Sequence, residues 1–167
     1  MKLVSAFAAA LLLIACAGAD AEDAPPRQDA ALLTACISAA LPQGGMVAIS
    51  DPRACIGQIS RACHDAMGDG GDTTAGMVAC AVRERDAWGE VLHQSAESLR
   101  QNESQTQRAA LAQMLEQGEA WMLARCGYAA SIYEGGSLAR VVAAQCQRDT
   151  MAERAIDLQL RLREGAL

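Results

Sequence analysis

The chain has 167 residues, a formal net charge of −6 and only five aromatic residues. Its only lysine is Lys2, so loss of the N-terminus would leave thirteen arginines against twenty acidic residues, a net charge of −7. Nucleic-acid phosphates require a basic protein face, so this acidic balance excludes nucleic acid as the expected partner. It suits a cationic partner instead.

The N-terminal segment has the pattern of an export signal. Lys2 is followed by a run without charge over residues 3–15, which is too short to span a bilayer as a helix and is typical of a signal peptide. Small residues before Asp20 predict cleavage after residue 19, so we expect residues 1–19 to be the signal peptide. Residues 20–28 are polar and contain prolines, and we expect them to form a tether.

A second processing site competes with the first. Leu13-Ile14-Ala15-Cys16 reads as a lipobox, which would place cleavage before Cys16 and a lipid on this residue. One lipid would hold the protein on a membrane surface without a transmembrane helix. Both alternatives stay open, and both predict the periplasm, with the protein either soluble or lipid-anchored to an envelope membrane.

The rest of the chain shows helical periodicity and no alternating strand pattern. We therefore expect an all-α fold in which disulfide-stapled antiparallel hairpins form a bundle of about four to five helices. One domain over residues 29–165 is long enough to bury a core of its own. The expected helices cover about 28–41, 51–67, 73–101, 104–134 and 137–165.

Six cysteines follow Cys16, which is the even number that a disulfide framework predicts for an exported chain. They lie about eight to ten residues on either side of three glycine-containing turns, so the two cysteines of each helical hairpin stand at matching height, within disulfide reach. The predicted pairs are Cys36–Cys55, Cys63–Cys80 and Cys126–Cys146. The spacings do not match the C-x-x-C or C-x₂₋₄-C patterns of redox and zinc sites, so we expect no metal and no cofactor.

Nothing in the sequence indicates a catalytic residue. Trp88 and Trp121 lie on apolar helical stripes and are expected in the core. His64 and His93 have no second ligand at helical spacing and are expected to be partly exposed. The acidic residues of the third helix alternate with arginines, which is typical of a solvated face; they are Glu84, Asp86, Glu90 and Glu97.

Three stretches between about Cys55 and Leu160 form a distinctive pattern. The first runs from Gly76 through Cys80 to Asp86-Ala87-Trp88 and Leu92, and the second contains Glu119-Ala120-Trp121, Arg125 and Cys126. The third contains Gly135-Gly136-Ser137, Cys146, Thr150, Ala152-Glu153-Arg154-Ala155 and Leu158. Together these stretches resemble the lysozyme inhibitor LprI N-terminal-domain family of exported bacterial proteins. The chain departs from the family pattern at His93 and Ala96, where an asparagine and a tyrosine are usual.

The resemblance implies an all-α hairpin bundle in the envelope and inhibition of lysozyme. The leading hypothesis is a non-enzymatic binding protein that occupies the cleft of a cationic lysozyme-type muramidase. The expected contact is the loop from Glu134 through Gly135 and Gly136 to Ser137. The alternative is a structural or interaction module of the cell envelope without inhibitory activity.

Overall fold

The computed structural model describes residues 25–41 and 51–164. Within these ranges the chain forms five α-helices and no strand, which confirms the all-α prediction. The helices are α1 (Pro25–Ala40), α2 (Gln58–Met67), α3 (Thr74–Asn102), α4 (Gln105–Ser131) and α5 (Ser137–Glu164). Two short 3₁₀ turns, η2 (Pro52–Cys55) and η3 (Gly68–Gly70), flank α2.

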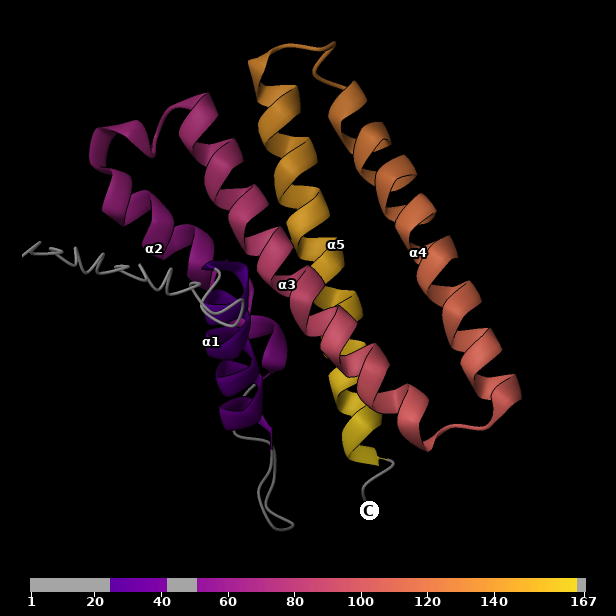
Figure 1. Cartoon of the computed structure of the whole chain (residues 1–167). Coiled ribbons are helices and arrows are strands. Elements are labelled where there is room, and N and C mark those ends of the chain that lie inside the picture. Colours follow the sequence, from indigo (N-terminus) through magenta and orange to yellow (C-terminus); the bar gives the residue numbers. More distant parts are fainter. Residues whose placement is uncertain (1–24, 42–50, 165–167) are drawn as a thin grey trace, which may run out of the picture.

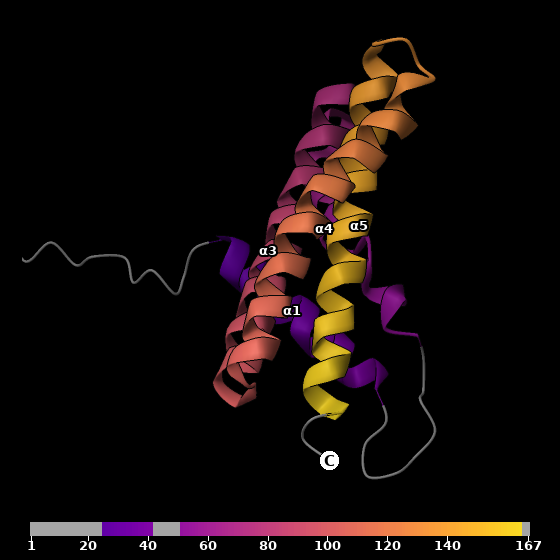
Figure 2. The same ribbon diagram turned by 90° about the vertical axis from the view of Figure 1, so that its right-hand side faces the viewer.

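The centre of the molecule is the pair formed by α3 and α5, which make the most extensive contacts of any two elements (Figure 1). Helices α1 and α2 pack against α3, and α4 packs against α5. Helix α4 therefore lies at the edge of the bundle. When the molecule is viewed from that edge, none of the other described helices lies in front of α4 (Figure 2).

Local capping signals define where the two long helices begin. The hydroxyl of Thr73 accepts a hydrogen bond of 3.0 Å from the backbone N–H of Gly76 at the start of α3. At the start of α4, Ser104 and Gln107 form a reciprocal capping box. Both interactions satisfy backbone donors that the first helical turn leaves free. The expected starts of both helices are confirmed.

Helix α1 begins earlier than expected. Its first residue is Pro25, so residues 25–28 of the predicted tether are helical. Proline is compatible with the first turn, where its missing N–H costs no hydrogen bond. Residues 1–24, with Cys16 and both predicted processing sites, lie outside the described residues. An ion pair docks α1 on α3: the half-exposed Arg83 contacts both carboxylate oxygens of the buried Asp29, at 2.6 and 2.9 Å, and this contact raises the pKa of the Arg83 guanidinium.

The prediction of one continuous second helix over residues 51–67 is wrong. Asp51 caps the short turn η2, and the chain then changes direction at Gly57, whose φ of 88° lies in the left-handed region. Glycine adopts this conformation without the steric cost that a side chain would impose. Helix α2 therefore starts only at Gln58.

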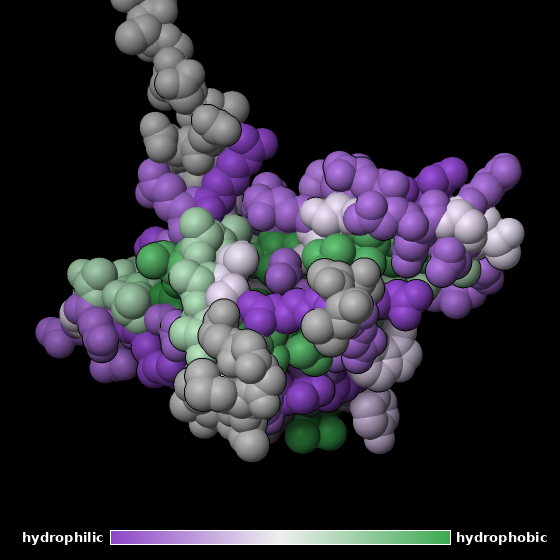
Figure 3. Space-filling view, turned by 90° about the horizontal axis from the view of Figure 1, so that it is seen from below, coloured by the Kyte–Doolittle hydropathy of each residue, from purple (hydrophilic) through white to green (hydrophobic). Residues whose placement is uncertain are grey.

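The core lies where α1, α3 and α5 meet. Trp88 is fully buried there, as predicted, and Leu33, Ile37, Val91 and Ile156 pack in the same cluster. Seen from below, the surface is largely hydrophilic, with hydrophobic residues visible between the hydrophilic areas (Figure 3). None of the described helices is long and apolar enough to cross a membrane.

Three disulfides staple the fold, and they are the pairs that the turn spacings predict. Cys36–Cys55 joins α1 to η2, with Cα atoms 6.0 Å apart. Cys63–Cys80 joins α2 to α3, and Cys126–Cys146 joins α4 to α5, each with Cα atoms 5.5 Å apart. Among the described elements, the two that each bridge connects are separated in the chain by no more than one short 3₁₀ turn.

Candidate functional site

The loop from Glu134 to Ser137 forms the tip of the hairpin made by α4 and α5. It is a tight turn in which Glu134 and Gly135 both have positive φ, of 50° and 76°. The backbone N–H of Gly136 closes the turn by donating to the carbonyl oxygen of Tyr133 at 2.9 Å. Every residue from 131 to 138 is exposed, so the tip projects from the bundle. Ser137 is the first residue of α5.

Large hydrophobic side chains surround this turn and were not part of the predicted contact. Tyr128 is 79% exposed and Ile132 is 71% exposed, although both side chains are large and hydrophobic. Tyr133 and Leu138 are exposed as well. We define the tip patch as Tyr128, Ile132, Tyr133 and Leu138 together with the turn. An exposed apolar cluster of this kind is characteristic of a protein-binding surface.

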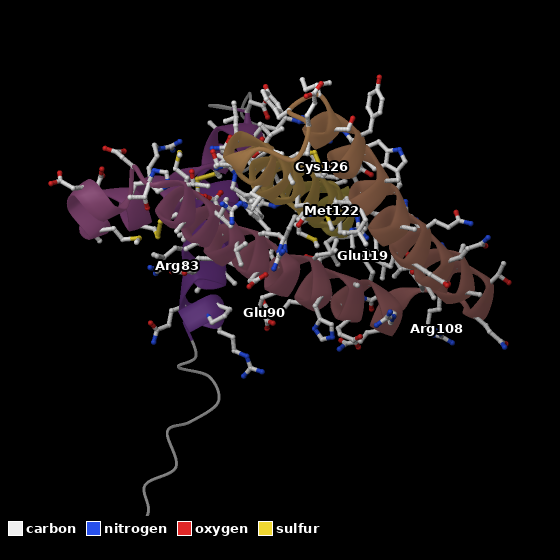
Figure 4. All side chains as sticks on the ribbon, turned by 90° about the horizontal axis from the view of Figure 1, so that it is seen from above. Arg83, Glu90, Arg108, Glu119, Met122 and Cys126 are labelled. Carbon is white, nitrogen blue, oxygen red and sulfur yellow. A yellow bond between two sulfur atoms is a disulfide. The ribbon has the colours of Figure 1, made fainter. Side chains whose placement is uncertain are left out.

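The disulfide Cys126–Cys146 holds the two helices together below the tip patch. Met122 and Cys126 are buried and point from α4 toward α5 (Figure 4). The sulfur of Cys126 lies 3.9 Å from the hydroxyl oxygen of Thr150, which is also buried. The covalent link leaves little freedom for α4 to separate from α5, so the tip is presented on a rigid stem.

Trp121 is not a core residue, which corrects the sequence prediction. Its side chain is 54% exposed, and the guanidinium of Arg125 lies 5.2 Å from the centre of its ring. Arg125 in turn donates a hydrogen bond of 2.6 Å to the hydroxyl of Thr150 on α5. The ring therefore covers an arginine that links the two helices, while about half of the side chain remains exposed to solvent.

A second arginine, Arg154, links α4 and α5 about one helical turn beyond Thr150 on α5. Arg154 donates to the carbonyl oxygen of Leu115 at 2.8 Å and to the carboxylate of Glu119 at 3.3 Å. Gly118 leaves room for this approach: a Cβ at that position would lie 2.9 Å from the Arg154 Nε, so the arginine side chain would have to shift. The second and third stretches that carried the family resemblance thus meet along one helix–helix contact.

Glu84 is fully buried, so the prediction that it belongs to a solvated face is wrong. Its two carboxylate oxygens accept hydrogen bonds from the backbone N–H groups of Gly57 and Ser60, at 2.5 and 2.7 Å, and from the indole of Trp88 at 3.0 Å. The carboxylate caps the N-terminus of α2 from a neighbouring helix. Its three donors give it a structural role.

The other polar candidates are dispersed. Asp86 pairs with Arg85, its neighbour in the chain, and Glu97 pairs with Arg100 one turn away. Glu90 faces α1, where Arg27 lies 3.7 Å from it, on the same side of α3 as Arg83 (Figure 4). His93 is exposed and His64 is partly buried, in line with the expectation for both. Among the described residues, no group of three or more His, Cys, Asp or Glu side chains could hold a metal ion.

A groove of about 540 Å³ lies beside α4. Its lining comes from α3, α4 and α5 and includes Leu92, Met114, Trp121, Arg154 and Leu158. The groove is open and mostly apolar, and it is separate from the turn at residues 134–137. Together the tip patch and the groove are two distinct surfaces of the α4–α5 hairpin.

Comparison with known proteins identifies the family of the chain. The sequence model of the family described as "Lysozyme inhibitor LprI" matches residues 63–158, a span that starts at a cysteine of the second disulfide and reaches nearly to the end of α5. No curated protein and no solved structure matches the chain. The match covers more than half of the sequence and contains all three stretches of the resemblance, and the chain belongs to the LprI lysozyme inhibitor family.

Proposed function

We propose that this protein is a non-enzymatic binding protein of the bacterial cell envelope that inhibits a lysozyme-type muramidase. The observation that carries the proposal is the tip patch, an exposed apolar cluster on a rigid, narrow hairpin within the matched family region. A muramidase cleft must admit a polysaccharide between two catalytic carboxyl groups. A projecting hairpin that fills part of the cleft excludes the substrate without any chemistry of its own.

Electrostatics supports a cationic enzyme as the target. The chain is acidic overall, with a net charge of −6, and Glu134 adds a carboxylate at the turn itself. Attraction between oppositely charged proteins accelerates their encounter, and salt weakens this attraction. Burial of apolar side chains at the centre of an interface determines most of the affinity. We therefore assign affinity to the tip patch and attraction at longer range to the acidic body.

We further propose export to the periplasm. The three disulfides suit an oxidising compartment outside the cytoplasm. In this proposal residues 1–19 are the signal peptide, with lipidation of Cys16 as the alternative, and the helical domain starts at Pro25 rather than at residue 29. Mass spectrometry of the mature protein separates the two processing routes, because only one of them adds a lipid.

The tip assignment is tested by a pair of matched substitutions. Ile132→Ser removes a side chain that is 71% exposed in the tip patch, whereas Leu32→Ser removes one that is 61% exposed on α1. We expect Ile132→Ser to weaken muramidase inhibition by roughly tenfold or more, the loss that a central interface side chain produces. Leu32→Ser should leave it unchanged.

The double substitution Glu134→Arg with Gly136→Trp probes the turn itself. It reverses the charge and adds bulk at positions that are both exposed. If this variant and Ile132→Ser inhibit as well as the unmodified protein, the tip does not enter the cleft. If the unmodified protein does not inhibit at all, the envelope interaction module without inhibitory activity becomes the better reading.

A further inference from the structure

One exposed side of α4, which includes five residues that line the groove, carries no charge along most of its length. Ten positions lie on one side of the helix at 100° per residue, and all ten are exposed. The outer face of an edge helix normally carries charged residues, because that face meets water. We define the smooth face as these ten residues: Ala110, Gln113, Met114, Gln117, Ala120, Trp121, Ala124, Gly127, Tyr128 and Ser131.

Large and small side chains alternate on the smooth face in a regular way. Met114, Trp121 and Tyr128 follow one another at intervals of seven residues, so they form one column along the helix. Small or slender residues lie between them at offsets of three to four, among them Ala124 and Ser131. A seven-residue repeat of large apolar residues is the pattern by which one helix packs against another.

The space beside this column is open. The groove of about 540 Å³ is lined by Leu92 of α3, by Met114 and Trp121 of α4, and by Leu158 of α5, among others. Because α4 packs only on α5 to any large extent, three helices surround a position that a fourth could fill. Figure 2 shows α4 with no described helix in front of it.

We propose that the smooth face is a homodimer interface in which α4 pairs antiparallel with α4 of a second copy. Pairing around a two-fold axis between residues 122 and 123 places Trp121 opposite Ala124 of the second copy. The same register places Tyr128 opposite Gln117 and Met114 opposite Ser131. Each large side chain then meets a smaller one, which is the complementarity that an isologous contact requires.

The dimensions of the face are sufficient for a weak dimer. From Ala110 to Ser131 it is about 32 Å long and about 10 Å wide, roughly 320 Å² of projected area in each copy; because side chains expose more accessible surface than their projection, burial over the two copies is on the order of 1,000 Å², about the minimum for a specific interface. No charged side chain of the face would be buried without a partner. The two acidic bodies repel each other, so salt should strengthen the dimer, opposite to its effect on binding of a cationic enzyme.

This interface leaves free the turn that is proposed to enter the muramidase cleft. In the antiparallel register the two turns at residues 134–137 lie near opposite ends of the paired helices. Tyr128 is shared between the tip patch and the smooth face, whereas the turn itself is not covered. Failure of one proposal therefore leaves the other standing.

Two adjacent residues provide the test. Ala124→Arg places a charge at the centre of the smooth face, whereas Leu123→Arg places the same charge at a position that is 52% exposed and lies about 100° around the helix, outside the smooth face. We expect sedimentation equilibrium of the purified, oxidised protein to show a monomer–dimer equilibrium below millimolar concentration. Ala124→Arg should raise the dissociation constant at least about tenfold, and Leu123→Arg should leave it within about twofold.

Three results overturn the proposal: a monomer at every concentration, a dimer that Ala124→Arg leaves intact, or equal weakening by both substitutions. Circular dichroism checks that the variants are folded. Should Ala124→Arg lose helicity, Gln117→Arg replaces it, because Gln117 is exposed on the same face and should weaken the dimer in the same way.

Discussion

The indole Nε1 of Trp88 donates a hydrogen bond of 3.0 Å to the Glu84 carboxylate, and both side chains are completely buried. The same carboxylate accepts hydrogen bonds from the backbone N–H groups of Gly57 and Ser60. Gly57 is the N-cap of α2 and has no side chain with which to cap it. Glu84 supplies the missing acceptor from α3, and a negative charge at a helix N-terminus is favourable.

Glu84→Gln should destabilise the protein by about 1–3 kcal/mol, because the amide has one acceptor oxygen for three buried donors and adds donors that have no acceptor. Urea denaturation at neutral pH measures the loss. Glu97→Gln is the matched control: Glu97 is exposed and makes an ion pair one turn away on its own helix. Its change should stay within about 0.5 kcal/mol. Equal effects of both substitutions would refute the capping role of Glu84.

Gly76→Ala should destabilise α3 strongly. A Cβ at Gly76 would lie 2.1 Å from the carbonyl oxygen of Gly70 and 2.9 Å from the backbone of Gly71, so the chain must move. Gly89→Ala in the same helix meets nothing within 4 Å and should stabilise the protein by about 0.5–1 kcal/mol. Thermal unfolding monitored by circular dichroism compares the two, and melting temperatures that shift in the same direction would contradict the packing described.

The two tryptophans should respond differently to removal. Trp88→Ala leaves a cavity in the core and should cost about 3–5 kcal/mol. Trp121→Ala removes a ring that is 54% exposed and should cost about 1 kcal/mol or less, chiefly through the lost Arg125 contact. Guanidinium titrations followed by far-ultraviolet circular dichroism give both values. A loss for Trp121→Ala as large as that for Trp88→Ala would mean that Trp121 is buried in solution.

Removal of the α4–α5 disulfide should affect both stability and inhibition. Replacing Cys126 and Cys146 together by serine should cost about 3 kcal/mol in the chain-entropy account and should free the stem of the tip. Replacing Cys36 and Cys55 should lower stability without weakening inhibition, because that bridge holds α1 at the other side of α3. Stability and inhibition of both double variants are measured side by side. Equal inhibition by the two would show that the stem need not be rigid.

Features set by short-range chemistry were predictable from the sequence. The glycine turns and the capping box at Ser104 depend only on residues close together in the sequence. Once two helices are joined by a short turn, the height of each cysteine follows from the helical rise, so the pairs such as Cys126–Cys146 follow as well. The start of α1 at Pro25 was missed because a polar, proline-bearing segment resembles a tether.

Features that depend on tertiary placement were not predictable. Glu84 alternates with arginines and resembles a surface residue, because nothing local shows that the N-terminus of α2 will meet it. Trp121 belongs to a helix with apolar residues around much of its circumference, so periodicity alone did not show which side faces α5. For the same reason, the sequence did not show that the residues of the smooth face would be exposed. The exposure of Tyr128 and Ile132 at the tip was not predicted, because the sequence does not show that no other helix packs over the end of α4.

Muramidase inhibition is the central claim and is tested most directly by a lysis assay. A chicken-type lysozyme is titrated with the purified, oxidised protein at ~150 mM salt, where nonspecific attraction between acidic and cationic proteins is screened, and an unrelated acidic protein of equal charge serves as the control. The account predicts saturable inhibition by this protein, none by the control, and loss of inhibition in Ile132→Ser. Lysis at the same rate with and without the protein would contradict it.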